Sequence, residues 1–419
     1  MDDLSAMLKR IKGFGDSVEL YRYAHHEIDV DSQRGETKAS DLSSVNYYVR
    51  VIKDGRMAAA PFYRPAEAER SAKLAVSLSK YAERLDMELP SKTRMRKAET
   101  YDKKVAGLDV DDLGDMMDAM NSSIDKRVEA LEAGVYTKHS SHSIVNTEGV
   151  DLSEDRTTFS ASMQAKVRGK DGVGERYDTT RFLFDSSSFG KEASEEALSQ
   201  VGAKRIEPGK YRVVFGKRLG SFYGMFLRLF AGSAVAVSQS CLYDKLGETL
   251  FSGNLSITDA PFEQSSSSRS FDSEGTVSQN KAIIESGAVK NFMFSQEWLA
   301  KARKRRIRGV STQTAGAADG GSNLKVKEGT IRDITDEGDV ILVKSFMGSH
   351  SFSIATGDFG IVAHVGFRMR DGEVVHPING VTINANMLAL MKSPILERKS
   401  FVQSGVISPR IGFDGVTCV

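Results

Sequence analysis

The feature that most constrains the fold is a strand-rich pattern that occurs twice in the first half of the chain. In each copy, alternating apolar and polar residues form two strand-like stretches that end in a Lys-Asp-Gly tripeptide. An Asp-Gly pair favours a tight hairpin, because both residues tolerate positive φ. Aligned without a gap, the copies match at Val18 and Val135, His25 and His142, and Asp54-Gly55 and Asp171-Gly172. We interpret this as a weak internal duplication, with a chance match as the alternative.

Helical spacing of apolar residues predicts helices after each copy and between them. One stripe comprises Leu74, Leu78, Tyr81 and Leu85, and we expect it to pack on the preceding strands. A helix is also predicted from Lys191 onward. Between the copies a longer helix is predicted, with Gly134 as its C-cap and a stripe formed by Leu113, Met117, Met120, Ile124, Val128 and Leu131.

The second half has a different character. A strand at residues 211–215 leads into an apolar stretch, Met225 to Val237, that we interpret as one buried helix. Short strands and turns follow, with hairpins predicted at Ser286-Gly287 and Asp371-Gly372. The sequence therefore predicts an α+β protein. Residues 1–208 form an N-terminal α/β domain of antiparallel strands and helices, with units at about 18–90 and 135–205, and residues 209–419 form a β-rich domain.

Charge and cysteine content limit the possible functions. The 419 residues include 57 Lys and Arg against 56 Asp and Glu, and this balance argues against nucleic-acid or membrane partners. The one basic run, Lys301–Arg308, is expected at a helix end in water. Two cysteines, Cys241 and Cys418, imply no disulfide framework, and the N-terminus has no apolar signal region. We therefore expect a cytoplasmic protein.

Histidine spacing gives little support for a metal site of another kind. His139 and His142 are three apart in a predicted strand, so their side chains should point to opposite faces. His25 and Glu27 share a face but provide only two ligands. The remaining candidates, His350, His364 and His376, are scattered. No Gly-x-Ser-x-Gly elbow and no phosphate-binding glycine loop occurs in the sequence.

Two longer strings carry a family resemblance. Residues 271–302 contain an Asp, a Glu-Gly, an Ile-Glu-x-Gly hairpin and a helix, and residues 356–387 contain Thr-Gly-Asp-Phe, a hairpin and Thr-Ile-x-x-Asn. In this order, and with the looser match at residues 145–149, the chain resembles the TldD/PmbA peptidase family over nearly its whole length.

The resemblance implies a particular branch of that family. TldD-type members have a His-Glu-x-x-x-His helix that binds Zn²⁺, with a cysteine nearer the C-terminus. Here the histidine positions fall on Tyr223 and Arg228, the glutamate on Gly224, and the cysteine at or beside Ser404. These side chains cannot form that zinc site. The chain is therefore identified as a TldE/PmbA-type member without metal or catalytic residues, whose zinc is expected in a TldD-type partner.

The resemblance also suggests a substrate-contacting loop. The family has a glycine-rich element matched here by Gly320, Gly321 and Asn323, and glycines allow a peptide backbone to approach closely. A plain surface turn is the alternative. The expected function is the non-catalytic subunit of a heteromeric TldD/TldE metallopeptidase that acts on peptides. The alternative is a stand-alone, homodimeric peptide-binding or structural protein, and a third possibility is a metal site built from other residues.

Overall fold

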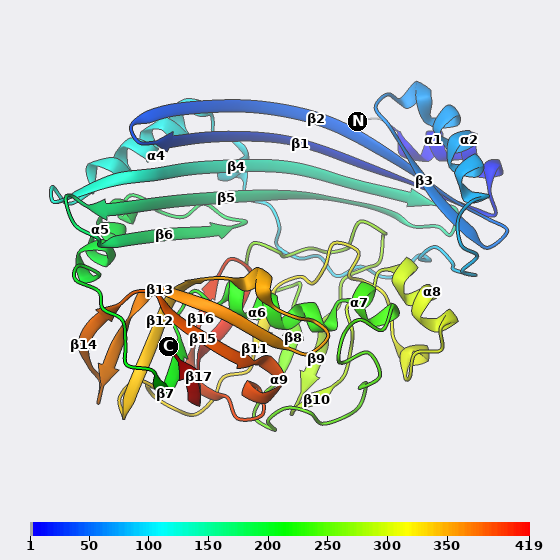
Figure 1. Ribbon diagram of the computed structural model, residues 1–419. Coiled ribbons are helices and arrows are strands. Elements are labelled where there is room, and N and C mark those ends of the chain that lie inside the picture. The colour runs from blue at the N-terminus through cyan, green and yellow to red at the C-terminus, as the bar shows by residue number, and fades with distance from the viewer. Residues whose placement is uncertain (1–2) are drawn as a thin grey trace.

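The chain folds into two β-sheets that lie one above the other, as expected for an α+β protein (Figure 1). The computed structural model describes residues 3–419. A long, curved six-stranded sheet from the first half of the chain arches over an eleven-stranded sheet from the second half.

The six-stranded sheet is antiparallel throughout. Its order is β3-β2-β1-β4-β5-β6, so the two three-stranded units meet where β1 pairs with β4. The strands are β1 (Ser17–Gln33), β2 (Glu36–Lys53), β3 (Arg56–Phe62), β4 (Val128–Asn146), β5 (Asp151–Val167) and β6 (Val173–Thr180).

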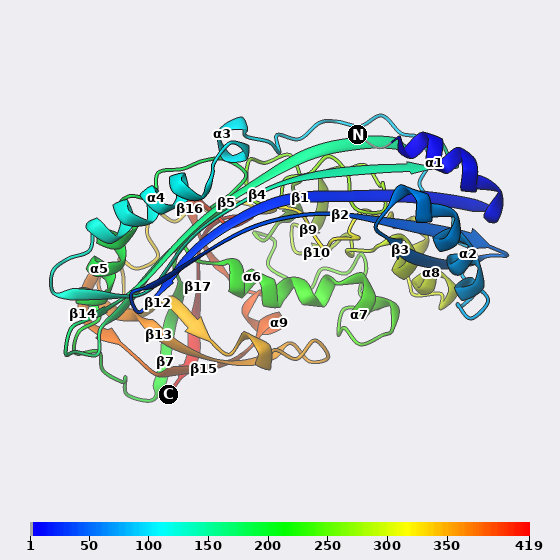
Figure 2. The same cartoon turned by 90° about the horizontal axis from the view of Figure 1, so that it is seen from above.

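Five α-helices accompany this sheet, and most of them cover its outer face (Figures 1 and 2). Helices α1 and α2 pack on one end of that face, and α4 and α5 pack on the other. Each three-stranded unit is followed by a helix, α2 after β3 and α5 after β6. The helices are α1 (Leu4–Ile11), α2 (Ala68–Ser79), α3 (Lys103–Ala106), α4 (Val110–Ser122) and α5 (Phe189–Ser199), with 3₁₀ turns η1 (Lys12–Phe14) and η2 (Pro65–Glu67).

The predicted Asp-Gly turn between β2 and β3 is confirmed. Asp54 and Gly55 have φ values of 52° and 69°, the positive angles that a two-residue hairpin turn requires. The same pairing of positive φ values confirms the turns at Ser286-Gly287 and Asp371-Gly372.

The turn between β5 and β6 differs from the prediction. Its positive φ, 65°, lies at Gly169, and residues 168–172 form a longer loop between the strands. Gly172 instead allows close packing, because a Cβ atom there would collide with the carbonyl oxygen of Ala197 in α5. The Asp-Gly signal therefore found the hairpin but not its geometry.

The predicted apolar stripe of the helix after β3 is wrong. Helix α2 ends at Ser79, and Leu74, Leu78 and Tyr81 are 48%, 44% and 90% exposed. The face that packs on β2 and β3 consists of small residues, Ala68, Ser71, Ala72, Ala75 and Ser79. Small side chains allow a helix to approach a sheet closely, and hydrophobicity alone does not reveal this choice.

The long helix predicted between the two units is also too long. Helix α4 buries Leu113, Met117 and Met120 as expected but ends at Ser122. Val128 begins β4, and the predicted C-cap Gly134 lies inside that strand opposite Asp31 and Ser162. Pairing with β1 on one side and β5 on the other outweighs the helical spacing of the apolar residues.

The eleven-stranded sheet closes part of itself into a ring. Strand β7 pairs with both β12 and β17, and the path β17-β15-β13-β12 completes the circuit. The strands are β7 (Gly209–Phe215), β8 (Ile257–Asp259), β9 (Lys281–Glu285), β10 (Ala288–Val289), β11 (Leu324–Val326), β12 (Asp339–Met347), β13 (Asp358–Arg370), β14 (Glu373–Ile378), β15 (Val381–Asn386), β16 (Ile395–Gln403) and β17 (Val406–Cys418).

The apolar stretch after β7 is buried, as expected, but it is not one helix. Its chain direction changes at Ala231, which has extended backbone angles, and Gly232 then approaches the carbonyl of Met293. The basic run follows the prediction, since Lys301 and Arg303 lie in the last turn of α8. The remaining helices are α6 (Gly220–Leu227), η3 (Arg228–Phe230), α7 (Gly232–Ala236), α8 (Gln296–Lys304), η4 (Val310–Thr312), η5 (Ser349–Ser351) and α9 (Met387–Leu390). None of the helices within residues 3–419 has the length and apolar character needed to cross a membrane.

Candidate functional site

Helix α6 and the 3₁₀ turn η3 that follows it contain the positions where the resemblance places metal ligands in zinc-bearing relatives. The first of them, Tyr223, is wholly buried. The Ser408 hydroxyl of β17 donates a 3.0 Å hydrogen bond to the Tyr223 hydroxyl. Burial raises the pKa of Tyr223 above its ordinary value, so the phenol remains protonated and neutral at neutral pH.

Aromatic side chains pack against one another along helix α6. Phe222 stacks on Phe215 with ring centroids 4.3 Å apart, and Phe226 meets Phe230 edge to face at 5.4 Å. Met225 and Leu229 of the same helical segment are also buried, as the sequence predicts together with Phe230. Large offset rings gain dispersion and quadrupole energy when water is excluded. The region around α6 is therefore a packed apolar core.

The other two positions, one in α6 and one at the start of η3, face away from that core. Gly224 and Arg228 are exposed, and the Arg228 guanidinium lies 5.7 Å from the centroid of the Phe352 ring. Residues five apart on a helix differ by about 140° in direction, so Tyr223 and Arg228 point to different sides. The three residues do not converge on one point in this chain.

The expected cysteine position lies in the turn between β16 and β17. Ser404 has a φ of 47°, and its hydroxyl oxygen is buried without a hydrogen-bond partner in the described part of the chain. The two cysteines are elsewhere, and burial raises both of their pKa values, that of Cys418 to about 12. Across residues 3–419, His, Cys, Asp and Glu side chains form no group of three or more placed to hold a metal ion.

The glycine-rich loop, residues 315–321, is held from one side by polar side chains. Arg269 donates 2.7 Å and 3.4 Å hydrogen bonds to the carbonyl oxygens of Gly320 and Gly316. The Asp272 carboxylate accepts a 3.2 Å hydrogen bond from the Ala318 amide. These bonds fix the backbone of the loop although it has no regular secondary structure.

The three residues predicted to contact substrate differ in their surroundings. Asn323 is wholly buried, and its amide group bonds the backbone of Ser267 and Glu263. Gly320 is exposed and has a φ of 81°, whereas Gly321 is half-buried beside Met293. Only the two glycines expose backbone that a ligand could reach, and their contact with substrate stays a prediction.

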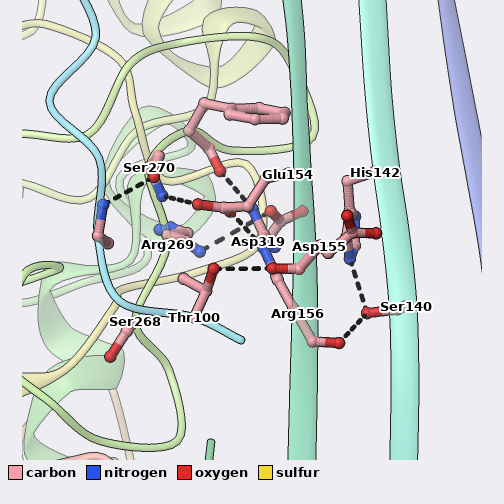
Figure 3. A network of polar contacts seen from close by, with 12 residues as sticks. Thr100, Ser140, His142, Glu154, Asp155, Arg156, Ser268, Arg269, Ser270 and Asp319 are labelled. Carbon is pink, nitrogen blue, oxygen red and sulfur yellow. Dashed lines mark hydrogen bonds and ion pairs between the residues drawn. The ribbon is translucent and has the colours of Figure 1, made fainter. Parts of the chain in front are cut away.

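A buried polar network connects this loop to the inner face of the six-stranded sheet (Figure 3). In β5, Arg156 pairs with Glu154 at 2.6 Å and donates a 2.7 Å hydrogen bond to the Phe271 carbonyl. Glu154 in turn accepts a 2.9 Å hydrogen bond from the Ser270 amide. Charged groups are tolerated here because each is paired and hydrogen-bonded.

Next to this ion pair lies a tyrosine–histidine pair. The Tyr21 hydroxyl is 2.6 Å from Nδ1 of His142, and Nε2 of His142 is 3.1 Å from the Ser140 hydroxyl. Burial and then the nearby Arg156 lower the pKa of His142 to about 2, so the imidazole is neutral at physiological pH. Both ring nitrogens are occupied, and this arrangement relays hydrogen bonds without carrying charge.

The histidine geometry predicted from the sequence is confirmed. His139 contacts Asp155 and Tyr101, whereas His142 contacts Tyr21 on the opposite face of β4. His25 and Glu27 share a face, with 3.9 Å between their nearest polar atoms. The three histidines of the second half of the chain, His350, His364 and His376, lie in η5, β13 and β14.

Sequence reasoning missed the network because its members are far apart in the chain. Arg156 and the Phe271 carbonyl are separated by 115 residues, and no local pattern pairs them. The only available signal was charge within the strand, since Glu154 and Arg156 are two apart and share a face.

A cleft of about 690 Å³ opens between the two sheets near helix α5. It lies among β6, α5, β12 and β16, and its lining includes the Phe401 ring beside the Lys217 ammonium, 4.7 Å away. Glu196 is buried in its wall and pairs with Arg218 at 3.2 Å and with Lys344. Both signs of charge and apolar surface therefore line the same space.

Comparisons with known proteins agree with this architecture. Residues 208–419 match the PmbA/TldA metallopeptidase C-terminal domain, and residues 101–201 match the central domain of the same family. An uncharacterized protein of Methanocaldococcus jannaschii is 26% identical over 99% of both chains. The metalloprotease PmbA of Escherichia coli O157:H7 is 24% identical over 70% of this chain and 66% of that protein.

Solved structures share the whole fold. A putative modulator of DNA gyrase from Thermotoga maritima superposes with a TM-score of 0.87 at 23% identity and covers all of both chains. TldE from Thermococcus kodakarensis gives a TM-score of 0.85 at 20% identity over 99% of each chain. With two family domains matched over most of its length, the chain belongs to the TldD/PmbA family.

Proposed function

We propose that this chain is the zinc-less, TldE/PmbA-type subunit of a two-chain metallopeptidase that acts on peptides or small unfolded proteins in the cytoplasm. In this proposal the TldD-type partner supplies the zinc ion, the general base and the bond cleavage. This chain completes the space in which the peptide is held.

The observation that carries the proposal is the chemistry of helix α6 and of Arg228, the first residue of η3. Tyr223 is neutral and packed in the core, Gly224 has no side chain, and Arg228 is a cation on the solvent side. A glycine cannot accept a proton from a metal-bound water, and a guanidinium repels a divalent cation. This helix supports packing rather than hydrolysis.

Two features of the chain suit peptide handling. The exposed backbone at Gly320 can approach an extended chain closely, and the cleft of about 690 Å³ is within the size range of ligand sites. Charges of both signs in the cleft fit a zwitterionic ligand such as a peptide.

The test combines purification, metal analysis and an activity assay. The chain is expressed alone and together with a His-Glu-x-x-x-His family member from the same genome, and each preparation is examined by size-exclusion chromatography and elemental analysis. We expect co-elution, zinc only when the partner is present, and chelator-sensitive cleavage of an unstructured peptide only by the complex.

A matched control shows which of the two chains performs the cleavage. A partner whose motif glutamate is replaced by glutamine should still bind zinc and co-elute, but cleavage should be lost. Stoichiometric zinc on this chain alone would contradict the proposal. Peptide binding by a homodimer without any partner would instead favour the stand-alone binding protein.

A further inference from the structure

One arginine is shared by a carboxylate of the six-stranded sheet and a carboxylate of a loop from the second half of the chain. Arg50 of β2 lies 3.2 Å from Glu19 of β1, and the same guanidinium nitrogen lies 3.7 Å from Glu274. Glu274 belongs to the loop that follows Phe271 in the second half of the chain. Glu19 and Glu274 are 2% and 6% exposed, whereas the Arg50 side chain keeps 18% of its surface exposed, so both carboxylates of this contact are shielded from water.

A third buried carboxylate joins the group. Asp272 is 1% exposed and accepts hydrogen bonds from the amides of Glu274, Thr276 and Ala318. Through Ala318 it is connected to the glycine-rich loop. The loop that faces Arg50 and the loop that exposes Gly320 are therefore joined by hydrogen bonds through Asp272.

The three carboxylates are not equally stabilised. Glu274 accepts a 2.7 Å hydrogen bond from the Gln296 amide, and Asp272 accepts three. Glu19 has one oxygen, Oε2, that is buried and has no hydrogen-bond partner in the described residues. One guanidinium cannot neutralise three carboxylates, so Glu19 is the one for which ionisation is least favourable.

We propose that Glu19, Arg50 and Glu274 form a proton-controlled latch between the two sheets. With Glu19 neutral, Arg50 is free to bind Glu274 and holds the loop of residues 271–276 against the six-stranded sheet. With Glu19 ionised, the two glutamates compete for Arg50, and the contact between the sheets loosens. Because Asp272 holds Ala318, the change is transmitted to the glycine-rich loop.

The charge environment places this switch near neutral pH. Burial raises the pKa of Glu19 to about 7, and Arg50 opposes the shift only in part. The groups that face it are Arg50, the carboxylates of Asp272 and Glu274, and the uncharged Asn146 of β4, while Glu297 of α8 acts on Arg50 from farther away.

The sign of the effect follows from linkage. The pKa of Glu19 is higher in the closed state than its ordinary value of about 4.5, so the closed state binds the proton more tightly. The stabilisation is complete below pH 4.5, is lost as pH rises through about 7, and stays lost above it. Between pH 6 and pH 8 these two pKa values correspond to an opening equilibrium about tenfold larger at pH 8.

Hydrogen exchange of the full-length chain tests the latch. Mass spectrometry would follow peptides from residues 268–279 and 315–322 at pH 6 and pH 8, corrected for intrinsic exchange rates. In the wild type we expect about tenfold less protection at pH 8. In Glu19→Gln, which cannot ionise, protection should be the same at both pH values. A Glu19→Gln variant that kept the pH dependence, or a wild type without it, would overturn the proposal.

Two further variants keep the test decisive. Glu27→Gln changes a carboxylate on the same face of β1 that pairs with Lys138 instead, and it should leave the pH dependence unchanged. In Glu274→Gln, Glu19 no longer competes for Arg50, so the Glu19 carboxylate ionises more readily. The midpoint of the exchange profile should therefore move to lower pH. An unchanged midpoint in Glu274→Gln would mean that the two glutamates do not share the arginine.

Discussion

The core around helix α6 and the ion pairs between the two sheets are both buried, but the two regions are filled differently. Around α6 the side chains are aromatic or aliphatic, and the Tyr223 hydroxyl bonds a single serine. Between the sheets lie ion pairs such as Glu154–Arg156 and Glu19–Arg50. The first region depends on volume and shape, whereas the second depends on every charge keeping its partner. The two regions should therefore respond differently to substitution.

The largest effect is expected from Arg156→Ala. It leaves the Glu154 carboxylate, 7% exposed, without its cation and should lower the free energy of unfolding by about 4 kcal/mol, measured by urea denaturation. Adding Glu154→Gln should restore part of the loss, because the stranded charge is removed. If the double variant is no more stable than Arg156→Ala, packing rather than charge holds this layer.

A slightly smaller loss is expected in the aromatic core. Phe226→Ala removes a wholly buried ring and should cost about 3 kcal/mol in the same assay. Phe226→Leu keeps most of the volume and should cost about 1 kcal/mol. Equal losses for both variants would show that ring contacts, not volume, determine stability around α6.

Removing the buried hydroxyl should cost less again. Tyr223→Phe loses the hydrogen bond with Ser408, which can still donate to the Pro409 carbonyl, so about 1 kcal/mol is expected. Ser408→Ala provides the matched comparison, and the double variant should cost less than the sum. A loss above about 3 kcal/mol would mean that Tyr223 has a further role, since one neutral hydrogen bond does not account for it.

The smallest effect is expected for an exposed residue of helix α2, and a buried position of the same helix provides the contrast. Leu78→Ser changes an exposed side chain and should alter stability by less than about 0.5 kcal/mol. Ala75→Leu, on the buried face four positions from Ser79, should destabilise by about 2 kcal/mol through overpacking. If Leu78→Ser were more destabilising than Ala75→Leu, the packing face of α2 would be the leucine stripe that hydrophobicity predicts.

Turns and histidine geometry were predictable because they depend on neighbouring residues only. Asp54-Gly55 takes the positive φ angles of a two-residue hairpin turn, although Asp171-Gly172 does not, and alternation places His139 and His142 on opposite faces of any strand. The packing face of α2 was not predictable, because the sheet beneath it selects alanines over leucines. The end of α4 was missed because the spacing of Val128 also fits a helix. Only its pairing with Val167 of β5 places it in strand β4.

The candidate site divides in the same way. The residue types at Tyr223, Gly224 and Arg228 follow from the sequence, and their chemistry excludes the zinc ligands of the resembling motif. Their directions do not follow from it: one points into the core and two face solvent. The burial of Asn323, which was expected to contact substrate, also depends on loops from elsewhere in the chain.

By itself the sequence determined the α+β class, the hairpins and the family resemblance, because each depends on residue types at short spacing, and the absence of a zinc site at Tyr223, Gly224 and Arg228 stays its prediction. Only the tertiary structure decided that Glu19, Arg50 and Glu274 share one buried site, and that Arg156 reaches the Phe271 carbonyl. Burial changes the electrostatic energy of a charge far more than any neighbour in sequence does, and burial is set by how the two sheets meet.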